Sequence, residues 1–156
     1  FLELAEGEFQ RYLRYHSVFS LAVFDFDHFK KINDQFGHHV GDIALKKLCE
    51  VVSSANRQVD KIGRLGGDEF ALLLPSTSLS TAVQVVERIR ALIENEVILI
   101  EDNQIQMTVS VGVTAIIAED DELNTLLQRS DVLLYEAKRK GSNRVEFKIT
   151  TEKDNL

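Results

Sequence analysis

The stretch VDKIGRLGGDEFALLL (residues 59–74) places two glycines and two carboxylates between two apolar runs. Paired glycines between strand-like runs predict a tight hairpin whose strands cover Val59–Leu65 and Phe70–Leu74. Glycine also allows a ligand to approach bare backbone. The carboxylates Asp68 and Glu69 have no evident architectural use at a hairpin tip. They indicate that a cation, most simply a metal ion, docks there.

Helical and strand-like patterns alternate on both sides of this hairpin. Apolar residues at helical spacing predict helices at Phe1–Tyr15, Phe29–Phe36, Val40–Ala55, Ser78–Asn95 and Asp121–Lys140. Further strands are predicted at Ser20–Phe26, Val97–Ile100, Ile105–Ile117 and Arg144–Phe147. Ser78 or Ser80 is the expected cap of the fourth helix, and Gly141 the expected stop of the last one. The inward positions expected on that last helix are Leu123, Leu126, Leu127, Val132 and Leu133.

The order of these elements predicts an α+β fold. A right-handed crossover makes the first strand parallel to the Val59–Leu65 strand, and the return strand of the hairpin can lie antiparallel between them. This is the split βαβ arrangement of ferredoxin-like folds, a βαββαβ core whose mostly antiparallel sheet is flanked by helices. It places Asp68 and Glu69 beside Asp25 and Asp27, at the end of the first strand. Two acidic groups far apart in the sequence are therefore predicted to converge at one edge of the sheet.

The composition limits the classes of function. The 156 residues suit one globular domain, and no apolar run approaches the roughly 20 residues that a membrane helix needs. A net charge of −7 argues against a protein that binds a nucleic-acid polymer through a broad basic surface. The single cysteine, Cys49, is expected to be a buried small hydrophobic residue rather than part of a disulfide, which favours a reducing cytoplasm.

Asp25 and Asp27 lie two residues apart at the end of an apolar strand, so both point to the same face. Beside Asp68 and Glu69 these carboxylates repel one another unless a divalent cation lies among them. Such hard oxygen ligands suit Mg²⁺ or Mn²⁺, which also bind nucleotide phosphates. The alternative is that Asp25 and Asp27 cap the following helix, whose N-terminus favours anions. We prefer the metal site and keep the capping role for Asp27.

Polar residues that follow the first strand suit a nucleotide. Backbone N–H groups at the next helix start can hold phosphate, and Lys30 adds a charge, although a solvated surface lysine is the alternative. An aspartate such as Asp42 can accept two hydrogen bonds from guanine, and an amide such as Asn33 can bond a purine edge. Both residue types are also common in turns and caps. His38 precedes the longer helix, where it can contact phosphate or ribose.

The chain resembles the GGDEF domain of diguanylate cyclases, and the resemblance covers nearly the whole sequence. Four segments carry it in the family's order and spacing: FDFDHFKKINDQFGHHVGD (24–42), RLGGDEFALLLP (64–75), TVSVGV (108–113) and LLYEAKRKGSNRV (133–145). The resemblance implies a bacterial, cytoplasmic, nucleotide-cyclase-like domain. Its activity would be the condensation of two GTP into cyclic di-GMP with release of two pyrophosphates.

The resemblance also implies roles for individual residues. Asp25, Asp68 and the backbone carbonyl of Phe26 match metal-binding positions for two Mg²⁺ (or Mn²⁺) ions per site. Asp68 is further the candidate for activating the ribose 3′-hydroxyl, and Glu69 is a required neighbour of the metals. The matching substrate contacts are Phe29, Lys30 and Lys138 for phosphate, Asn33 and Asp42 for guanine, His38, and the glycines Gly66 and Gly67 that let the nucleotide pass. Ser142 stands where many members have a phosphate-binding arginine, and Arg144 or Lys140 can only partly substitute.

The family's assembly and regulation extend these expectations. In-line attack of the 3′-hydroxyl on an α-phosphate joins two GTP molecules held by two domains, so a two-fold homodimer is expected. Arg57 and Asp60 form an RxxD string at the offset of the family's product-inhibition site for cyclic di-GMP, and Arg88 matches a further arginine of that site. The alternative for this string is a surface ion pair of little energetic consequence.

Ser142 also keeps a second function open, a degenerate module that binds GTP or cyclic di-GMP as a receptor without turnover. A cyclase with another nucleotide preference is a third, because class III adenylyl cyclases share a related core, and Asp42 favours guanine. The family usually opens with a short segment that this chain lacks. We therefore expect a GGDEF domain at residues 1–148, excised from a regulatory protein that can be membrane-anchored upstream, and a polar tail at 149–156.

Overall fold

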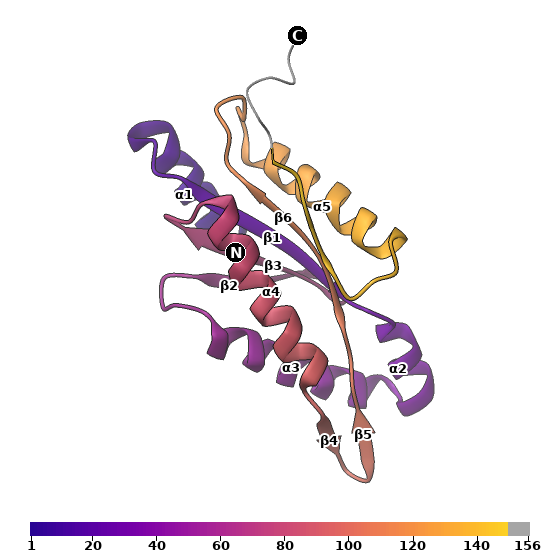
Figure 1. Ribbon diagram of the computed structural model, residues 1–156. Helices are drawn as coiled ribbons and strands as arrows, with labels where there is room; N and C mark the ends of the chain where they lie inside the picture. The colour runs from indigo at the N-terminus through magenta and orange to yellow at the C-terminus, as the bar shows by residue number, and fades with distance from the viewer. Residues whose placement is uncertain (150–156) are drawn as a thin grey trace.

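Five strands form the central sheet of the computed structural model, which describes residues 1–149 (Figure 1). They are β1 (Phe19–Phe26), β2 (Lys61–Gly66), β3 (Glu69–Pro75), β6 (Val109–Ala115) and β7 (Val145–Phe147). Their order is β2-β3-β1-β6-β7, and only β6 and β7 pair in parallel. Strand β3 is antiparallel to both β1 and β2 and lies between them. The predicted split βαβ core and mostly antiparallel sheet are confirmed.

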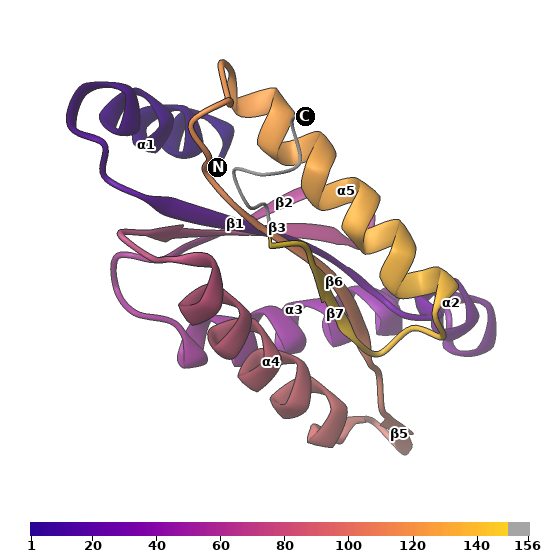
Figure 2. The same ribbon diagram turned by 45° about the horizontal axis from the view of Figure 1, so that its top comes forward.

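Helices cover both faces of this sheet (Figure 2). They are α1 (Leu2–Tyr15), α2 (Phe29–Phe36), α3 (His38–Ala55), α4 (Leu79–Asn95) and α5 (Leu123–Arg139). Helices α1 and α5 lie on one face, α3 and α4 lie on the other, and α2 lies beyond the end of β1. Strand β1 is buried along its whole length because it is covered from both sides.

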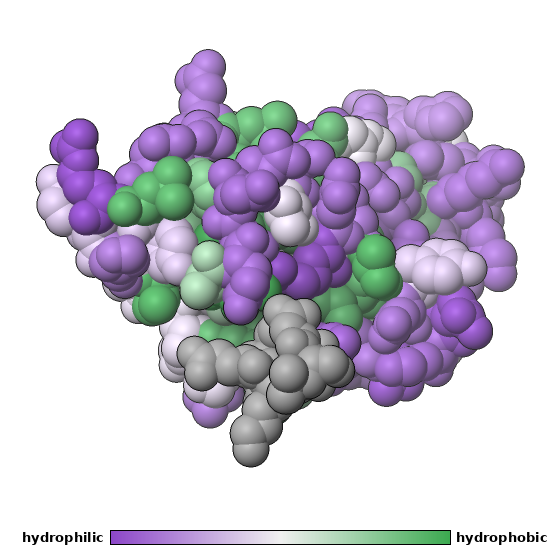
Figure 3. Space-filling model, turned by 90° about the horizontal axis from the view of Figure 1, so that it is seen from above, coloured by the Kyte–Doolittle hydropathy of each residue, from purple (hydrophilic) through white to green (hydrophobic). Residues whose placement is uncertain are grey.

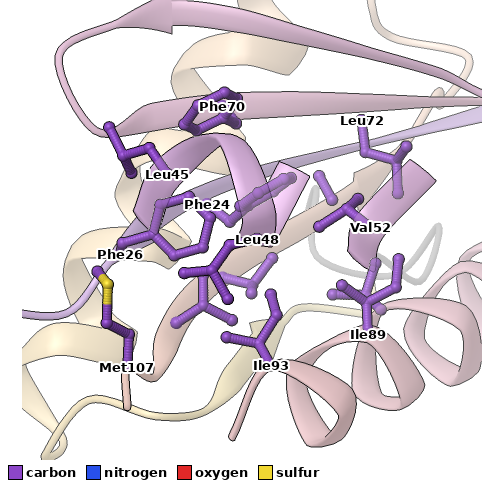
Figure 4. Packing of buried hydrophobic residues seen from close by; sticks show 14 of the residues in the cluster. Phe24, Phe26, Leu45, Leu48, Val52, Phe70, Leu72, Ile89, Ile93 and Met107 are labelled. Atoms are coloured by element: carbon purple, nitrogen blue, oxygen red, sulfur yellow. The ribbon is translucent and has the colours of Figure 1, made fainter. Parts of the chain in front are cut away.

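Alternate side chains of the central strands pack on opposite faces of the sheet. Phe24 and Phe26 of β1 and Phe70 of β3 pack toward α3 and α4 (Figure 4), whereas Leu21 and Leu73 pack toward α1 and α5. Phe24 and Phe70 are register partners, and their rings stack with centroids 5.9 Å apart. Such a cross-strand aromatic pair fixes the register of two strands. It therefore fixes which acidic residues meet at the adjoining edge.

The predicted strand Ile105–Ile117 is wrong at its start. The chain forms a separate hairpin of β4 (Ile98–Ile100) and β5 (Asn103–Ile105), and β6 begins only at Val109. Glu101 turns this hairpin with a left-handed backbone (φ 54°). The sheet cannot continue before Val109, because that residue pairs with Phe26, the last residue of β1.

Expectations for single residues have mixed outcomes. Ser78 caps α4 by accepting a hydrogen bond from the N–H of Thr81, and Gly141 follows the end of α5 with φ 115°. The inward position predicted for Val132 is wrong, because this side chain is 59% exposed beside the buried Leu133. Cys49 is half-buried rather than buried, and this burial raises the pKa of its thiol to about 11. Beyond residue 149, the predicted polar tail lies outside the described residues.

Figure 3 shows one face as largely hydrophilic, with apolar side chains in small separate groups, which is ordinary for a water-exposed protein surface. Within residues 1–149, no helix is both long and apolar enough to span a membrane.

Candidate active site

The end of β1 and the start of β3 meet at one edge of the sheet. Asp25 is the register partner of Glu69, and the N–H of Phe26 donates to the carbonyl oxygen of Asp68 at 3.4 Å. Asp25 is buried, Asp68 is half-buried and Glu69 is exposed. The predicted convergence of the two acidic groups is confirmed.

A hollow of about 290 Å³ opens beside this edge. Its lining contains these predicted residues: Asp25, Phe26, Phe29, Lys30, Asp68 and Lys138. Asp27, His28 and Ser142 complete the lining. His28 lies at the helix start that was predicted to hold phosphate, and its backbone is left-handed with φ 58°. Larger hollows of about 590, 510 and 460 Å³ lie along α1, between α4 and β7, and between α1 and β2. Of these three, only the last has a carboxylate in its lining, that of Glu3.

The electrostatics of the hollow centre on Asp25. Burial raises the pKa of this carboxyl group, and the negative charges of Asp68 and Glu69 raise it further. Lys138 of α5 acts in the opposite direction, because its Nζ lies 2.8 Å from Oδ2 of Asp25. The carboxylates therefore form a site that attracts positive charge, and Lys138 supplies one such charge.

The oxygen donors of this edge suit a divalent cation that arrives with a nucleotide. Within the described part of the chain, no group of three or more His, Cys, Asp or Glu side chains is placed to hold a metal ion. Mg²⁺, however, usually takes only one or two protein carboxylates and completes its octahedron with waters and substrate phosphates. The three residues predicted to bind metal, Asp25, Phe26 and Asp68, all line the hollow.

The capping role predicted for Asp27 is wrong. The N-cap position of α2 is His28, and no side chain caps this helix. The carboxylate of Asp27 accepts hydrogen bonds from Thr108 Oγ1 and Ser110 Oγ, both at 2.6 Å, and from the N–H of Asn143 at 3.0 Å. It therefore binds β6 and the loop after α5 instead of the helix that follows it in sequence.

The residues predicted to read guanine lie at the corner between α2 and α3, next to the hollow but outside its lining. Asn33 is on α2, and His38 and Asp42 are exposed on the first turns of α3. The Oδ1 atom of Asn33 is buried without a hydrogen-bond partner among residues 1–149. It lies directly over Gly41, where a Cβ would overlap it and would lie 3.2 Å from the Phe29 ring. Phe29 thus connects this corner to the hollow.

The two glycines of the hairpin also lie outside the lining. Gly66 and Gly67 are exposed, and a side chain at either position would meet open space. Gly67 has φ 52°, a left-handed conformation that glycine adopts without strain.

Two residues of the predicted second site, Arg57 and Asp60, pair just after α3, and the third, Arg88 of α4, contacts the end of α3. The buried Asp60 accepts hydrogen bonds from the backbone and guanidinium of Arg57, with Nη2–Oδ1 at 3.0 Å. Arg57 also donates to Thr77 Oγ1 at 2.7 Å. Arg88 donates to the carbonyl oxygen of Ala55 at 2.8 Å. Both oxygens of Asp60 are thus engaged, whereas the Arg57 side chain is 53% exposed.

Comparison with known proteins identifies the family. The family model described as "Diguanylate cyclase, GGDEF domain" matches residues 1–144. The chain belongs to the GGDEF family. It is 39% identical over 137 residues to diguanylate cyclase A of Treponema denticola, covering 88% of this chain and 36% of that relative. The chain spans between 21% and 37% of the length of five curated relatives that it matches.

Solved GGDEF structures share the fold. The active GGEEF domain of a diguanylate cyclase from Vibrio cholerae superposes with a TM-score of 0.88 at 32% identity, over 96% of this chain and 94% of that one. The GGDEF domain of DgcB from Caulobacter crescentus, solved in complex with c-di-GMP, also gives 0.88 at 27% identity, over 93% and 86%. The predicted nucleotide-cyclase-like fold is confirmed.

Proposed function

We propose that this GGDEF domain is a diguanylate cyclase, which condenses two GTP into cyclic di-GMP and releases two pyrophosphates. The observation that carries the proposal is the meeting of Asp25, Asp68 and Lys138 at one hollow, with Glu69 outside its lining as the register partner of Asp25. A site for phosphoryl transfer needs this combination, because the carboxylates attract metal ions while the lysine neutralises phosphate charge.

The nucleotide would extend from the hollow to the α2–α3 corner. Lys30 and Lys138 would contact its phosphates, and the glycines at the hairpin tip would leave room for it. Asn33 and Asp42 would bind the guanine, with His38 as a further contact. The buried Asn33 oxygen has no partner within the described residues and is costly in that state, so a turn of this amide toward the ligand would be favoured.

In the proposed reaction, the ribose 3′-oxygen of one GTP forms a bond to the α-phosphorus of the other, and the bond from this phosphorus to the bridging oxygen of pyrophosphate breaks. Asp68 would take the hydroxyl proton, with Glu69 beside it. Two Mg²⁺ or Mn²⁺ ions, held by Asp25, Asp68 and the Phe26 carbonyl, would supply charge neutralisation at the phosphates. Lys138 would hold the charge that develops on the leaving group.

Two copies of the domain would have to meet face to face, because each hollow would hold one GTP and the product has two-fold symmetry. Specific activity should therefore rise steeply with protein concentration. We further propose that cyclic di-GMP inhibits by binding at Arg57, Asp60 and Arg88. Asp60 would act there mainly by orienting the exposed Arg57 guanidinium toward the ligand.

The direct test is incubation of concentrated protein with GTP and Mg²⁺, followed by chromatography for cyclic di-GMP. Asp68→Asn keeps the size of the side chain and should abolish product formation without a change in the thermal unfolding midpoint beyond a few degrees. Binding of GTP without any product, even in a covalently linked dimer, would contradict the enzyme and favour the receptor function.

A further inference from the structure

Asp27 is a buried carboxylate for which the proposed chemistry has no use. Its exposed fraction is 6%, and its three hydrogen-bond donors come from two distant parts of the chain. Ser110 donates from β6 and Thr108 from the position just before this strand. The backbone N–H of Asn143 donates from the loop between α5 and β7. Three such bonds to one charged group cost much to arrange, so they indicate a defined role.

The loop that Asp27 contacts is held in an unusual conformation. Ser142 and Asn143 both have left-handed backbones, with φ of 62° and 47°. Consecutive non-glycine residues rarely adopt this region unless surrounding contacts impose it. Asn143 supplies these contacts, since its side chain accepts a hydrogen bond from Arg90 Nη1 and donates one to Glu94 Oε1, both at 2.7 Å. The loop is thus held by Asp27, just after β1, and by Arg90 and Glu94 of α4.

The same loop forms one wall of the hollow. Ser142 lines it, and the N–H of Ser142 donates to the carbonyl oxygen of Ala137 at 3.0 Å, which closes the last turn of α5. That turn carries Lys138, which also lines the hollow. A displacement of the loop therefore moves both the wall and the lysine.

We propose that Asp27 is a positioning residue, which acts through the Ser142–Asn143 loop to hold Ser142 and Lys138 toward the phosphates of the nucleotide. This inference rests on the proposed nucleotide site and adds a residue to its machinery. It also explains how a chain with serine at position 142 keeps an ordered wall there.

The charge of Asp27 matters because every partner is a donor. A carboxylate accepts all three bonds, whereas an amide has one acceptor atom and presents N–H groups on the other side. The two hydroxyl groups can turn to accept, but the backbone N–H of Asn143 cannot. The Thr108 and Asn143 bonds both end on Oδ2, so an amide oxygen at that position can keep them while Ser110 turns to accept. A neutral amide oxygen is a weaker acceptor than a carboxylate. Asp27→Asn should therefore loosen the loop while leaving the bulk of the side chain in place.

The experiment compares Asp27→Asn with Asp120→Asn in the 156-residue chain. Asp120 is a matched control, because it is also buried and also fastens a loop, through Arg129 and the N–H of Ile117, but at the opposite end of β6. Two quantities are measured for each variant. One is the amide hydrogen-exchange rate of Ser142 and Asn143 by NMR. The other is the dissociation constant for a GTP analogue with an α,β-methylene bridge in the presence of Mg²⁺.

Asp27→Asn should speed exchange at Asn143 and raise the dissociation constant, each by about tenfold. Asp120→Asn should lower the unfolding midpoint but leave both quantities as in the parent chain. Asn143→Gly keeps the left-handed backbone and removes the ties to α4, so it should weaken binding in the same way. Since both residues act on one loop, the double variant should lose less than the product of the two single losses.

Unchanged exchange at Asn143 in Asp27→Asn would overturn the inference, as would faster exchange with unchanged nucleotide affinity. Equal loss of affinity in Asp27→Asn and Asp120→Asn would also overturn it, because stability alone would then account for the effect. A parent chain that binds no nucleotide would refute the proposed function and the phosphate-directed role with it. The exchange rates would still decide whether Asp27 holds the loop.

Discussion

The ammonium group of Lys138 lies 2.8 Å from Oδ2 of Asp25, so a lysine of α5 serves as counter-ion to the carboxylate that is expected to bind metal. A cation that reaches Asp25 must compete with this lysine. A nucleotide phosphate would offer Lys138 a new partner and so would free Asp25. The two ligands should therefore favour each other's binding beyond their direct contact.

Lys138→Gln should separate the competition of Lys138 with a cation at Asp25 from its contact with the nucleotide phosphate. Without nucleotide, the variant should bind Mn²⁺ more tightly than the parent chain, because no ammonium group competes at Asp25. Its affinity for GTP should fall by about tenfold, because one charge-assisted hydrogen bond to phosphate is lost. Titration with Mn²⁺ followed by electron paramagnetic resonance gives the first quantity and calorimetry the second.

The neighbouring Arg139→Gln is the control, since it removes the same charge from a side chain that lies over the Tyr135 ring. Weaker Mn²⁺ binding in Lys138→Gln than in Arg139→Gln would show that Lys138 does not compete with the cation.

Because the pKa of Asp25 is raised in the folded chain, its ionised carboxylate should lower the stability of the fold at neutral pH. Because this pKa is higher in the folded than in the unfolded chain, the carboxyl group favours folding at pH values below its ordinary 3.8. That contribution is lost as the pH rises through the raised value. Asp25→Asn should therefore raise the unfolding midpoint at pH 7, and the difference should shrink as the pH falls through the pKa of Asp25.

The pKa of Glu146 is shifted in the opposite direction to that of Asp25. Hydrogen bonds and charges from Lys140 and Arg144 lower its pKa, so its contribution to stability is present at neutral pH and is lost as the pH falls through that lowered value. Glu146→Gln should lower the unfolding midpoint at pH 7 and have little effect in strong acid. Thermal scans of both variants from pH 7 to pH 3 test the pair, and a lower midpoint for Asp25→Asn at pH 7 would refute the first half.

The acidic edge was predictable from sequence because it depends on local periodicity. Only Phe26 separates Asp25 from Asp27, and the right-handed crossover places β3 next to β1, so Asp25 and Glu69 were expected to meet. The partners of Asp27 were not predictable, since Ser110 and Asn143 lie far along the chain and donors of this kind leave no pattern. The β4–β5 hairpin was missed for a related reason. Its isoleucines look like strand residues, but which strand they pair with depends on where β1 ends.

A substitution of Arg88 can test product inhibition without disturbing the fold. Arg57→Ala would remove a cation from the buried Asp60 and so would reduce stability as well as ligand binding. Arg88 bonds only a helix-end carbonyl within the described residues, so Arg88→Ala is the cleaner change. It should raise the concentration of cyclic di-GMP needed for half inhibition by about tenfold, with initial turnover unchanged.

Arg57→Lys complements this variant, because it keeps the charge but loses the planar fork that pairs with carboxylate or phosphate. It should weaken inhibition while retaining most of the stability. If the inhibition curves of both variants superpose on that of the parent chain, Arg57 and Arg88 do not bind the inhibitory cyclic di-GMP.

The contact between Gly41 and Asn33 allows a test of the preference for guanine over adenine. Its missing side chain leaves the space that Asn33 Oδ1 occupies, so Gly41→Ala must displace the Asn33 amide or the nearby Phe29 ring. If Asn33 helps to bind guanine, the variant should lose affinity for GTP more than for ATP, and the ratio of the two affinities should fall by about tenfold, the cost of one hydrogen bond to a buried group. Competition with a fluorescent nucleotide measures this ratio.

Gly7→Ala is the control for this variant. It lies on the open side of α1, where a Cβ meets nothing, and should slightly stabilise the chain. A folded Gly41→Ala chain with an unchanged ratio would place the guanine away from the α2–α3 corner, because the Asn33 oxygen cannot keep its position beside a methyl group.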